Sequence, residues 1–449
     1  MRNLVVASAV AAALTGGLAV AATAPTAPQA LAATNIIYIS GSSAAKAAVK
    51  ASIAGADWCN GNPMSSFASG TPDFNAWSCT ANAGPFTGQT TTIYYRAEGG
   101  SVVGVLPLIN NVAIKQLDLS TAGGCPQTAT GSVTCTVGGT SGNNGLNDSW
   151  TSGVFTPSVN SQLGISDLEP SAFIGQNAPH YTFVGPLKTA TQLKNTSLLA
   201  QAPMFQQVFG LIINNTAAGI SGVNNLSTQA VRDILAGSLG DWSNVPAAAT
   251  VAGLTSQSAA AATAGVATVA STTTPITVCN REAGSGTRTG ATLYFLGANC
   301  TTTAQTLNDS GSPADNFSTN DEIACVQAHP GSIGYVSIDH QTGNGTTAVG
   351  VSLDGVTPTN TKAALGQYTW VYEASFNQNP AANATNKSFY TYFLPKFQTL
   401  AEAPQTVDVL AIPNLQTNTA QFPLQTSGVI ATSLYTRFGN SCNALASQN

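Results

Sequence analysis

The chain has 449 residues, of which only 7% are charged, and its formal net charge is −5. Its 14 lysines and arginines are too few for a basic stripe, which argues against binding to nucleic acid or to an anionic lipid surface. The length allows two or three domains of roughly 150 residues each.

The N-terminal segment has the pattern of a secretory signal peptide. One arginine precedes the apolar run Leu4–Val20, which is followed by small residues and prolines. Small-x-small cleavage sites end at Ala21 and at Ala32, and the second is preferred because the strand-like Asn35–Ile39 begins just beyond it. The junction contains no cysteine, so the sequence does not indicate a lipid anchor. We therefore expect residues 1–32 to be removed and the mature protein to be periplasmic or secreted.

The rest of the chain alternates between two hydrophobic patterns. Short β-branched runs such as Asn35–Ile39, Thr91–Tyr95 and Val208–Ile213 alternate with Ala, Leu and Gln stretches of helical spacing. This alternation predicts an α/β architecture. Residues 119–162 and 246–274 are rich in small polar residues or alanine, and we predict that both are surface insertions or loops without a site of their own.

A first strand-to-helix junction covers residues 38–46. It runs from a strand through Gly41, Ser42 and Ser43 into an alanine-rich helix. Glycine allows close approach of the backbone, serine hydroxyls can cap the helix, and free amides at its start can bind an anion. The alternative is an ordinary serine N-cap.

A second junction, at residues 94–104, again leads from a strand through a Gly/Ser turn into an apolar stretch. Gly100 and Ser101 could supply amides and a hydroxyl. The alternative is a plain turn without a ligand.

The third junction carries the most chemistry. A strand ending near Cys279 delivers Arg281, and the turn that contains Ser285, Gly286 and Thr287 then opens a helix. A guanidinium, two hydroxyls and several amides at a helix start can converge on one tetrahedral oxyanion. The spacing differs from that of a Walker A loop, whose lysine is absent.

Eight cysteines in an exported chain predict four disulfides. Two local pairs are expected, Cys59 with Cys79 and Cys125 with Cys135. The other four allow three pairings, among which Cys300 with Cys325 and Cys279 with Cys442 is preferred. The three histidines are isolated in sequence, so we expect neither a metal site nor a cofactor.

At Arg281–Thr287 the motif Arg-x-x-Gly-Ser-Gly-Thr resembles the ligand loop of phosphate-binding proteins that serve ABC importers. Three further segments resemble that family in the same order along the chain, Val208–Asn214, Leu226–Trp242 and His329–Val336. The resemblance extends over roughly residues 35–440, with insertions. The combination of segments is specific, whereas each alone would be weak.

The resemblance implies a type II periplasmic-binding-protein fold. Two α/β lobes would be joined by two crossover strands, with the ligand in a cleft between them. Residues 35–170 and 340–449 would form the first lobe and residues 171–339 the second. Ligands of open α/β sheets bind at the carboxyl ends of strands, which agrees with the three junctions.

The resemblance also implies a set of ligand-binding residues: Ser42, Ser43, Gly100, Ser101, Asp167, Arg281, Ser285, Gly286 and Thr287. Asp167 ends a Gly-x-Ser-Asp turn, and its carboxylate would accept a proton that phosphate carries and sulfate lacks. The alternative is that Asp167 only caps a helix. Arg96 and Glu98 depart from the family pattern near the second junction and could alter selectivity.

The leading hypothesis is therefore capture of inorganic phosphate or a similar oxyanion for uptake, without catalysis. The protein would be a monomer, with an ABC importer component in the membrane as a further partner. A second hypothesis is a secreted phosphatase-like enzyme, but that chemistry requires a metal pair or a general base, and the sequence has no Asp/His cluster. A third is an extracellular adhesion or structural protein on the same fold, suggested by the uncharged surface and the stapled insertions.

Overall fold

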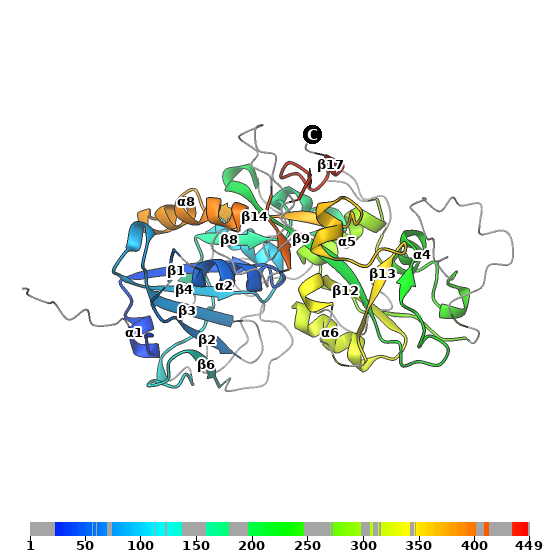
Figure 1. Ribbon diagram of the computed structural model, residues 1–449, viewed down its shortest axis with the longest axis horizontal. Helices are drawn as coiled ribbons and strands as arrows, with labels where there is room; N and C mark the ends of the chain where they lie inside the picture. The colour runs from blue at the N-terminus through cyan, green and yellow to red at the C-terminus, as the bar shows by residue number, and fades with distance from the viewer. Residues whose placement is uncertain are drawn as a thin grey trace, which may run out of the picture.

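The computed structural model describes residues 23–447, with gaps at 56, 60, 70–73, 112, 122–123, 137–158, 179–195, 247–269, 271–272, 298–305, 309–312, 314–315, 342–344, 346, 401–407 and 413–432. Within the described residues the protein is a mixed α/β structure with two lobes, one on each side of the strands β9 and β14 (Figure 1). A mixed sheet of 13 described strands runs through both lobes.

The first lobe is built on the strands that the β-branched runs predict. β1 is parallel to β4 and to β8, and the sheet continues through antiparallel strands to its edge at β6. The strands are β1 (Asn35–Gly41), β2 (Ser65–Ser69), β3 (Phe74–Thr80), β4 (Thr90–Arg96), β6 (Ser132–Cys135) and β8 (Leu163–Ser166). Because β1, β4 and β8 are parallel to one another, their carboxyl ends open at one edge of the sheet.

Helices α2 (Lys46–Ala54) and α8 (Ala384–Thr399) belong to this lobe. Phe389, Phe393 and Phe397 recur at helical spacing on α8, and all three are fully buried in one core with Trp58. The Trp58 ring meets that of Phe393 at 5.0 Å, edge to face, an arrangement that aromatic pairs favour. The C-terminal part of the chain thereby completes the first lobe.

The second lobe surrounds the outer half of β9. Strands β12 and β13 flank it antiparallel, and β10 and β11 extend the sheet. The strands are β10 (Asn225–Leu226), β11 (Thr277–Val278), β12 (Ser332–Ser337) and β13 (Val349–Leu353), and the helices are α4 (Thr228–Leu235), α5 (Gly286–Phe295), α6 (Thr319–Ala328) and α7 (Asn360–Ala364). Val208–Ile213, predicted as a strand, forms this half of β9 and is buried throughout.

Two strands cross between the lobes, as expected. β9 (Ala200–Ile213) and β14 (Val371–Gln378) pair antiparallel over most of the length of β14. The return to the first lobe falls later than predicted, because β13 pairs with β9 and α7 packs in the second-lobe core. The predicted boundary at residue 340 is therefore wrong, and the chain returns at Val371.

The folded first lobe begins before the predicted start at Asn35. The short helix α1 (Ala27–Leu31) places Ala27 and Ala30 in the core with no exposed surface, and the Thr92 hydroxyl donates to the Ala30 carbonyl at 2.7 Å. Apolar burial of this kind stabilises the lobe, and its loss would expose the outer face of the sheet. Residues 1–22 lie outside the described residues. Among the described helices, none combines the length and the apolar character that a bilayer span requires.

The first predicted insertion is only partly a surface loop. Its described portion contains β6, which pairs parallel with β2 at the sheet edge, and Leu119 and Val133 are buried in the same core as α1. The period-two pattern of this strand is short and lies among Gly, Thr and Ser, which is why a loop was predicted. Most of the second insertion lies outside the described residues.

The two local disulfides are confirmed, Cys59 with Cys79 and Cys125 with Cys135. The preferred pairing of the other cysteines is wrong, since Cys279 bonds to Cys325. Cys279 follows β11 and Cys325 lies on α6, which packs over the neighbouring strand β12, so the sheet brings two distant cysteines together. Cys442 is also disulfide-bonded, and Cys300 lies outside the described residues.

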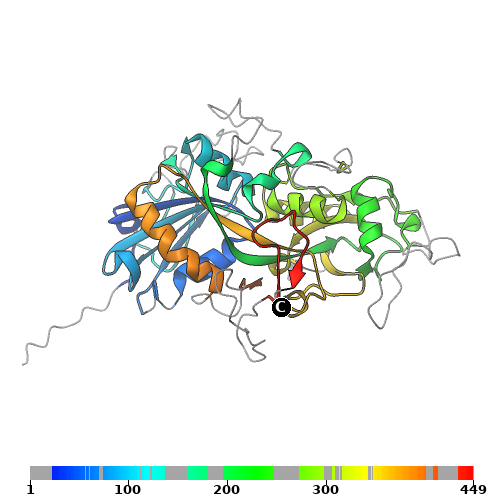
Figure 2. The same cartoon turned by 90° about the horizontal axis from the view of Figure 1, so that it is seen from above.

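The C-terminal segment, residues 433–447, is held beside the crossover strands (Figure 2). Its Thr436 hydroxyl and Arg437 amide donate to the buried Glu373 carboxylate on β14, and its Ser441 amide donates to Glu169 at 2.7 Å. Burial raises the pKa of Glu169, against hydrogen bonds from Ser441 that lower it. Two buried carboxylates thus satisfy the backbone donors of a segment with little regular structure.

Candidate functional site

The three strand-to-helix junctions meet where the two lobes face each other. The β1–α2 and β4 loops and the end of β8 come from the first lobe, and the β11–α5 loop and the start of α6 come from the second. Hydrogen bonds that join the lobes among the described residues here include those from Val102 N to Gly284 O at 2.9 Å, from Gly99 N to Phe317 O at 3.3 Å, and between the Ser43 and Thr319 hydroxyls at 2.9 Å. The predicted site residues of both lobes are therefore gathered in one region.

Asp167 lies at the centre of this region. The Ser42 hydroxyl donates to Asp167 Oδ1, and the Asp167 amide donates to Ser101 Oγ at 2.9 Å. A Cβ at Gly286 would come within 2.6 Å of Asp167 Oδ2 and even closer to Ser101 Oγ. Glycine is therefore required at this position, because a side chain would separate the second-lobe loop from the first lobe.

The Asp167 carboxyl is buried, and its burial raises its pKa. The Ser42 hydroxyl, the charge of Arg281 and the hydroxyls of Ser101 and Thr287 act in the opposite direction. The alternative reading of Asp167 as a helix cap does not hold, because the short 3₁₀ turn that follows begins at Pro170, with Glu169 as its N-cap. Ser101 supplies the hydroxyl of the second junction, and Gly100, at φ +69°, provides the turn before it.

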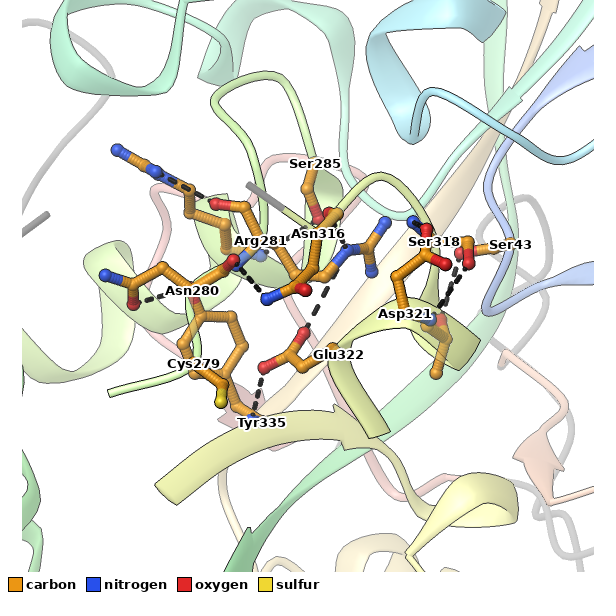
Figure 3. Close-up of polar contacts among 12 residues, drawn as sticks. Ser43, Cys279, Asn280, Arg281, Ser285, Asn316, Ser318, Asp321, Glu322 and Tyr335 are labelled. Atoms are coloured by element: carbon orange, nitrogen blue, oxygen red, sulfur yellow. Dashed lines mark hydrogen bonds and ion pairs between the residues drawn. The ribbon is translucent and has the colours of Figure 1, made fainter. Parts of the chain in front are cut away.

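Arg281 is almost wholly buried beside this carboxyl. Its Nε donates to the Asn316 carbonyl at 2.9 Å (Figure 3). Its Nη2 donates to the Phe317 carbonyl at 3.3 Å. Nε also lies 3.9 Å from Glu322 Oε2. An arginine remains charged even in such surroundings, so Arg281 places a fixed positive charge between the lobes.

The remaining residues of the third junction form the start of α5. Ser285 is the N-cap, and its hydroxyl accepts from Arg288 N at 3.3 Å. Arg288 Nη1 in turn donates to the Arg281 carbonyl at 2.9 Å, which fixes the loop that precedes the helix. Thr287 is buried in the first turn, where the positive end of the helix dipole favours an anion. The helix begins at Gly286, inside the turn that was predicted to precede it.

Sequence reasoning missed the contribution of α6. Ser318 caps this helix and forms a capping box with Asp321, and Thr319 in its first turn reaches Ser43 of the first lobe. A Ser-x-x-Asp signal before a helical stretch could have located this second helix start. Glu322 follows, fully buried, and no local pattern connects it with Arg281. Burial raises the pKa of Glu322 to about 8, with the charge of Arg281 opposing the rise.

Arg96 and Glu98, the two residues near the second junction that differ from the resembled family, contact each other in the first lobe. Arg96 and Glu98 form an ion pair at 3.8 Å, and Arg96 also donates to the Lys115 carbonyl at 3.2 Å. The Arg96 guanidinium stacks over the Phe74 ring at 5.1 Å, a cation–π contact that suits a buried arginine. Arg96 therefore balances the charge of Glu98 next to the second loop.

One group of candidate metal ligands exists among the described residues, Cys279, Cys325 and His329. The two cysteines are joined in a disulfide, so neither offers a thiolate. His329 Nδ1 lies 2.8 Å from the Cys325 carbonyl at the end of α6. The disulfide in this group links α6 to the segment after β11 within the second lobe.

One family model matches part of the chain. Residues 190–397 match the family model described as the PBP superfamily domain. The matched region contains the crossover strand β9, the Arg281–Thr287 loop, α6 and the segment His329–Val336. All four segments that suggested phosphate-binding proteins lie inside the matched region.

Solved structures with a similar outline include several at low sequence identity. A putative phosphate ABC transporter substrate-binding protein with bound phosphate from Clostridium perfringens is 15% identical, with a TM-score of 0.40, and the match covers 80% of this chain and 93% of that one. PstS from Borrelia burgdorferi is 14% identical, with a TM-score of 0.33 and coverage of 81% and 92%. No curated protein matches the chain.

Proposed function

We propose that this protein is an exported solute-binding protein that captures inorganic phosphate between its two lobes. The observation that carries the proposal is the convergence on Asp167 of the Ser42 and Ser101 hydroxyls from one lobe and of Arg281 and the start of α5 from the other. The PBP superfamily domain over residues 190–397 supports the solute-binding role.

The groups that converge suit a tetrahedral oxyanion. Arg281 offers guanidinium donors and a charge, and the starts of α5 and α6 both face the same region with hydroxylated residues, Thr287 and Thr319. Helix starts stabilise anions through free amides and the helix dipole. Hydrogen bonds to a desolvated anion are stronger than those between neutral groups, so a few donors are enough for tight binding.

Asp167 decides in favour of phosphate among the oxyanions. A buried carboxylate repels an anion unless a shared proton joins the two. Phosphate and arsenate carry such a proton near neutral pH, whereas sulfate does not. The carboxyl of Asp167 thus acts as a filter for protonated oxyanions.

Calorimetric titration of the purified protein with phosphate, arsenate, sulfate and molybdate tests this function. We expect phosphate and arsenate to bind and sulfate and molybdate to bind far more weakly. Equal affinity for sulfate would remove the role given to Asp167, and heat signals absent for all four anions would contradict the oxyanion site itself.

Export and delivery to an ABC importer in the membrane complete the proposed role. Because α1 packs in the first-lobe core, we place the signal-peptide cleavage after Ala21 and not after Ala32. N-terminal sequencing of the exported protein is expected to begin at Ala22. A mature chain that begins at Ala33 would contradict this placement, since it would lack Ala27 and Ala30.

A further inference from the structure

Glu322 occupies an unusual position for a carboxylate in an anion site. It lies in the first turn of α6 with no exposed surface, and its Oε1 accepts from the Tyr335 amide at 2.7 Å. Its Oε2 lies 3.9 Å from Arg281 Nε, and no group in the described part of the chain donates a hydrogen bond to it. The carboxyl thus faces the guanidinium that would hold the anion (Figure 3).

The structure leaves this carboxyl little room to turn away. A Cβ at Gly334 of β12 would come within 3.1 Å of Glu322 Oε1 and within 2.8 Å of a Val326 methyl. The side chain is therefore packed between α6 and the sheet. Its distance from Arg281 is set by the packing of the lobe and does not depend on a flexible surface contact.

The charges around Arg281 make the protonation state of Glu322 important. Four carboxyl groups face the guanidinium: Asp167 from the end of β8, Glu282 beside it, and Asp321 and Glu322 from α6. Arg288 contributes a second positive charge, and Tyr335, whose pKa burial raises, stays neutral. If all four carboxyls were ionised, the region would be negative before any anion arrived, and charges repel strongly where water is excluded.

We propose that Glu322 is a proton-controlled counter-charge to Arg281, so that the site takes up phosphate when this carboxyl is neutral and rejects it when the carboxyl is ionised. The proposal rests on the proposed function and adds a pH limit to it. A neutral Glu322 leaves the charge of Arg281 to the ligand. An ionised Glu322 neutralises that charge and adds repulsion.

The transition lies in the mildly alkaline range. Burial raises the pKa of Glu322 to about 8, and the charge of Arg281 and the hydrogen bond from the Tyr335 amide do not cancel that rise. Phosphate affinity should therefore fall as the pH rises through about 8. Asp167 also has a raised pKa, but its proposed role is to share the proton of the ligand, which is a separate contact.

Phosphate titrations of the wild type and of Glu322→Gln between about pH 6 and about pH 10 test the coupling. Phosphate itself loses a proton near neutral pH, and taking the ratio of the two affinities at each pH removes that effect. We expect the ratio of variant to wild-type affinity to be nearly constant below about pH 7 and to rise roughly tenfold or more by about pH 9. Asp57→Asn, at an exposed carboxyl of the first lobe, is the control and should follow the wild type.

Thermal unfolding without ligand provides an independent readout. A carboxyl whose folded pKa is raised is favourable to the fold in its protonated form, and that stability is lost as the pH rises from the unfolded value of 4.5 to about 8. The wild type should lose stability relative to Glu322→Gln over this interval, while Asp167 and Glu169 contribute equally to both proteins. The infrared band of a protonated carboxyl in the wild type, lost above about pH 8, serves if the variant does not fold.

The outcomes separate the two proposals. A flat stability difference with no carboxyl band shows that Glu322 is ionised throughout and overturns the inference. Titration of Glu322 with a constant affinity ratio also overturns it, while phosphate capture stands. Absence of phosphate binding in every protein at every pH overturns the phosphate site and the inference with it.

Discussion

Replacement of Arg281 by alanine is expected to weaken phosphate binding by at least about 2 kcal/mol, which is a loss of roughly thirtyfold in affinity. The guanidinium is the fixed positive charge nearest to Asp167, and a charged donor to a desolvated anion contributes more than a neutral one. Titration calorimetry at about pH 7 measures the loss. Unchanged affinity would remove Arg281 from the site.

The same variant should also be less stable. Arg281 donates to the carbonyls of Asn316 and Phe317, and a buried acceptor left without its donor costs about 1–3 kcal/mol. Arg281→Lys keeps a charge but loses the planar fork, so we expect intermediate affinity from it. Arg232→Ala on α4 is the control, because its side chain lies in the exposed part of the second lobe and contacts Gln229.

Replacement of Asp167 by asparagine is expected to change the selectivity by orders of magnitude. The amide supplies a donor and removes the repulsion, so sulfate should gain affinity relative to phosphate. A misplaced buried charge costs several kcal/mol, which is why a factor of two would not be the expected size. Competition titrations with the two anions measure the ratio. If the variant keeps the wild-type selectivity, the filter lies elsewhere, and Glu98 is the next candidate.

Stability provides a second check on Asp167. Its pKa is raised by burial, so its protonated form favours the folded state, and this stability is lost as the pH rises above the unfolded value of 3.8. At neutral pH the asparagine variant should therefore unfold at a higher temperature than the wild type. A lower unfolding temperature would show that the hydrogen bonds from Ser42 and Ser101 outweigh the cost of burial.

Much of the candidate site could be located from the sequence because each junction is a local pattern. Strand, glycine, hydroxyl and helix follow one another within about ten residues, and propensity together with capping rules is enough to place Ser42, Ser101 and Ser285 at loop ends. The resemblance to a known family then assigned Asp167 and Arg281 to one ligand. The structure places them together, within reach of each other's charge.

Other features depend on pairings that local patterns do not encode. Glu322 reaches Arg281 only because α6 packs on β12, and Cys279 finds Cys325 through the same contact. The chain returns to the first lobe only at Val371 because β13 pairs with β9 in the second lobe. The sequence of a short strand does not specify which strand it will pair with. Helix α1 was missed because the small residues that form it lie near an expected cleavage site and have the composition of a linker. They belong to the core only because they pack against the sheet, which their own sequence does not reveal.

The disulfide between Cys279 and Cys325 has a consequence for how much of the site is ordered before a solute binds. It closes a loop of 46 residues between the strand that delivers Arg281 and the helix that carries Thr319 and Glu322, a constraint of about 4 kcal/mol on the unfolded chain. The second-lobe half of the site is thereby assembled when the protein oxidises, before any solute arrives. The ordering of this half of the site therefore adds little entropy cost when an anion binds. The reduced protein should therefore bind phosphate more weakly than the oxidised one, which titration calorimetry with and without a reductant measures.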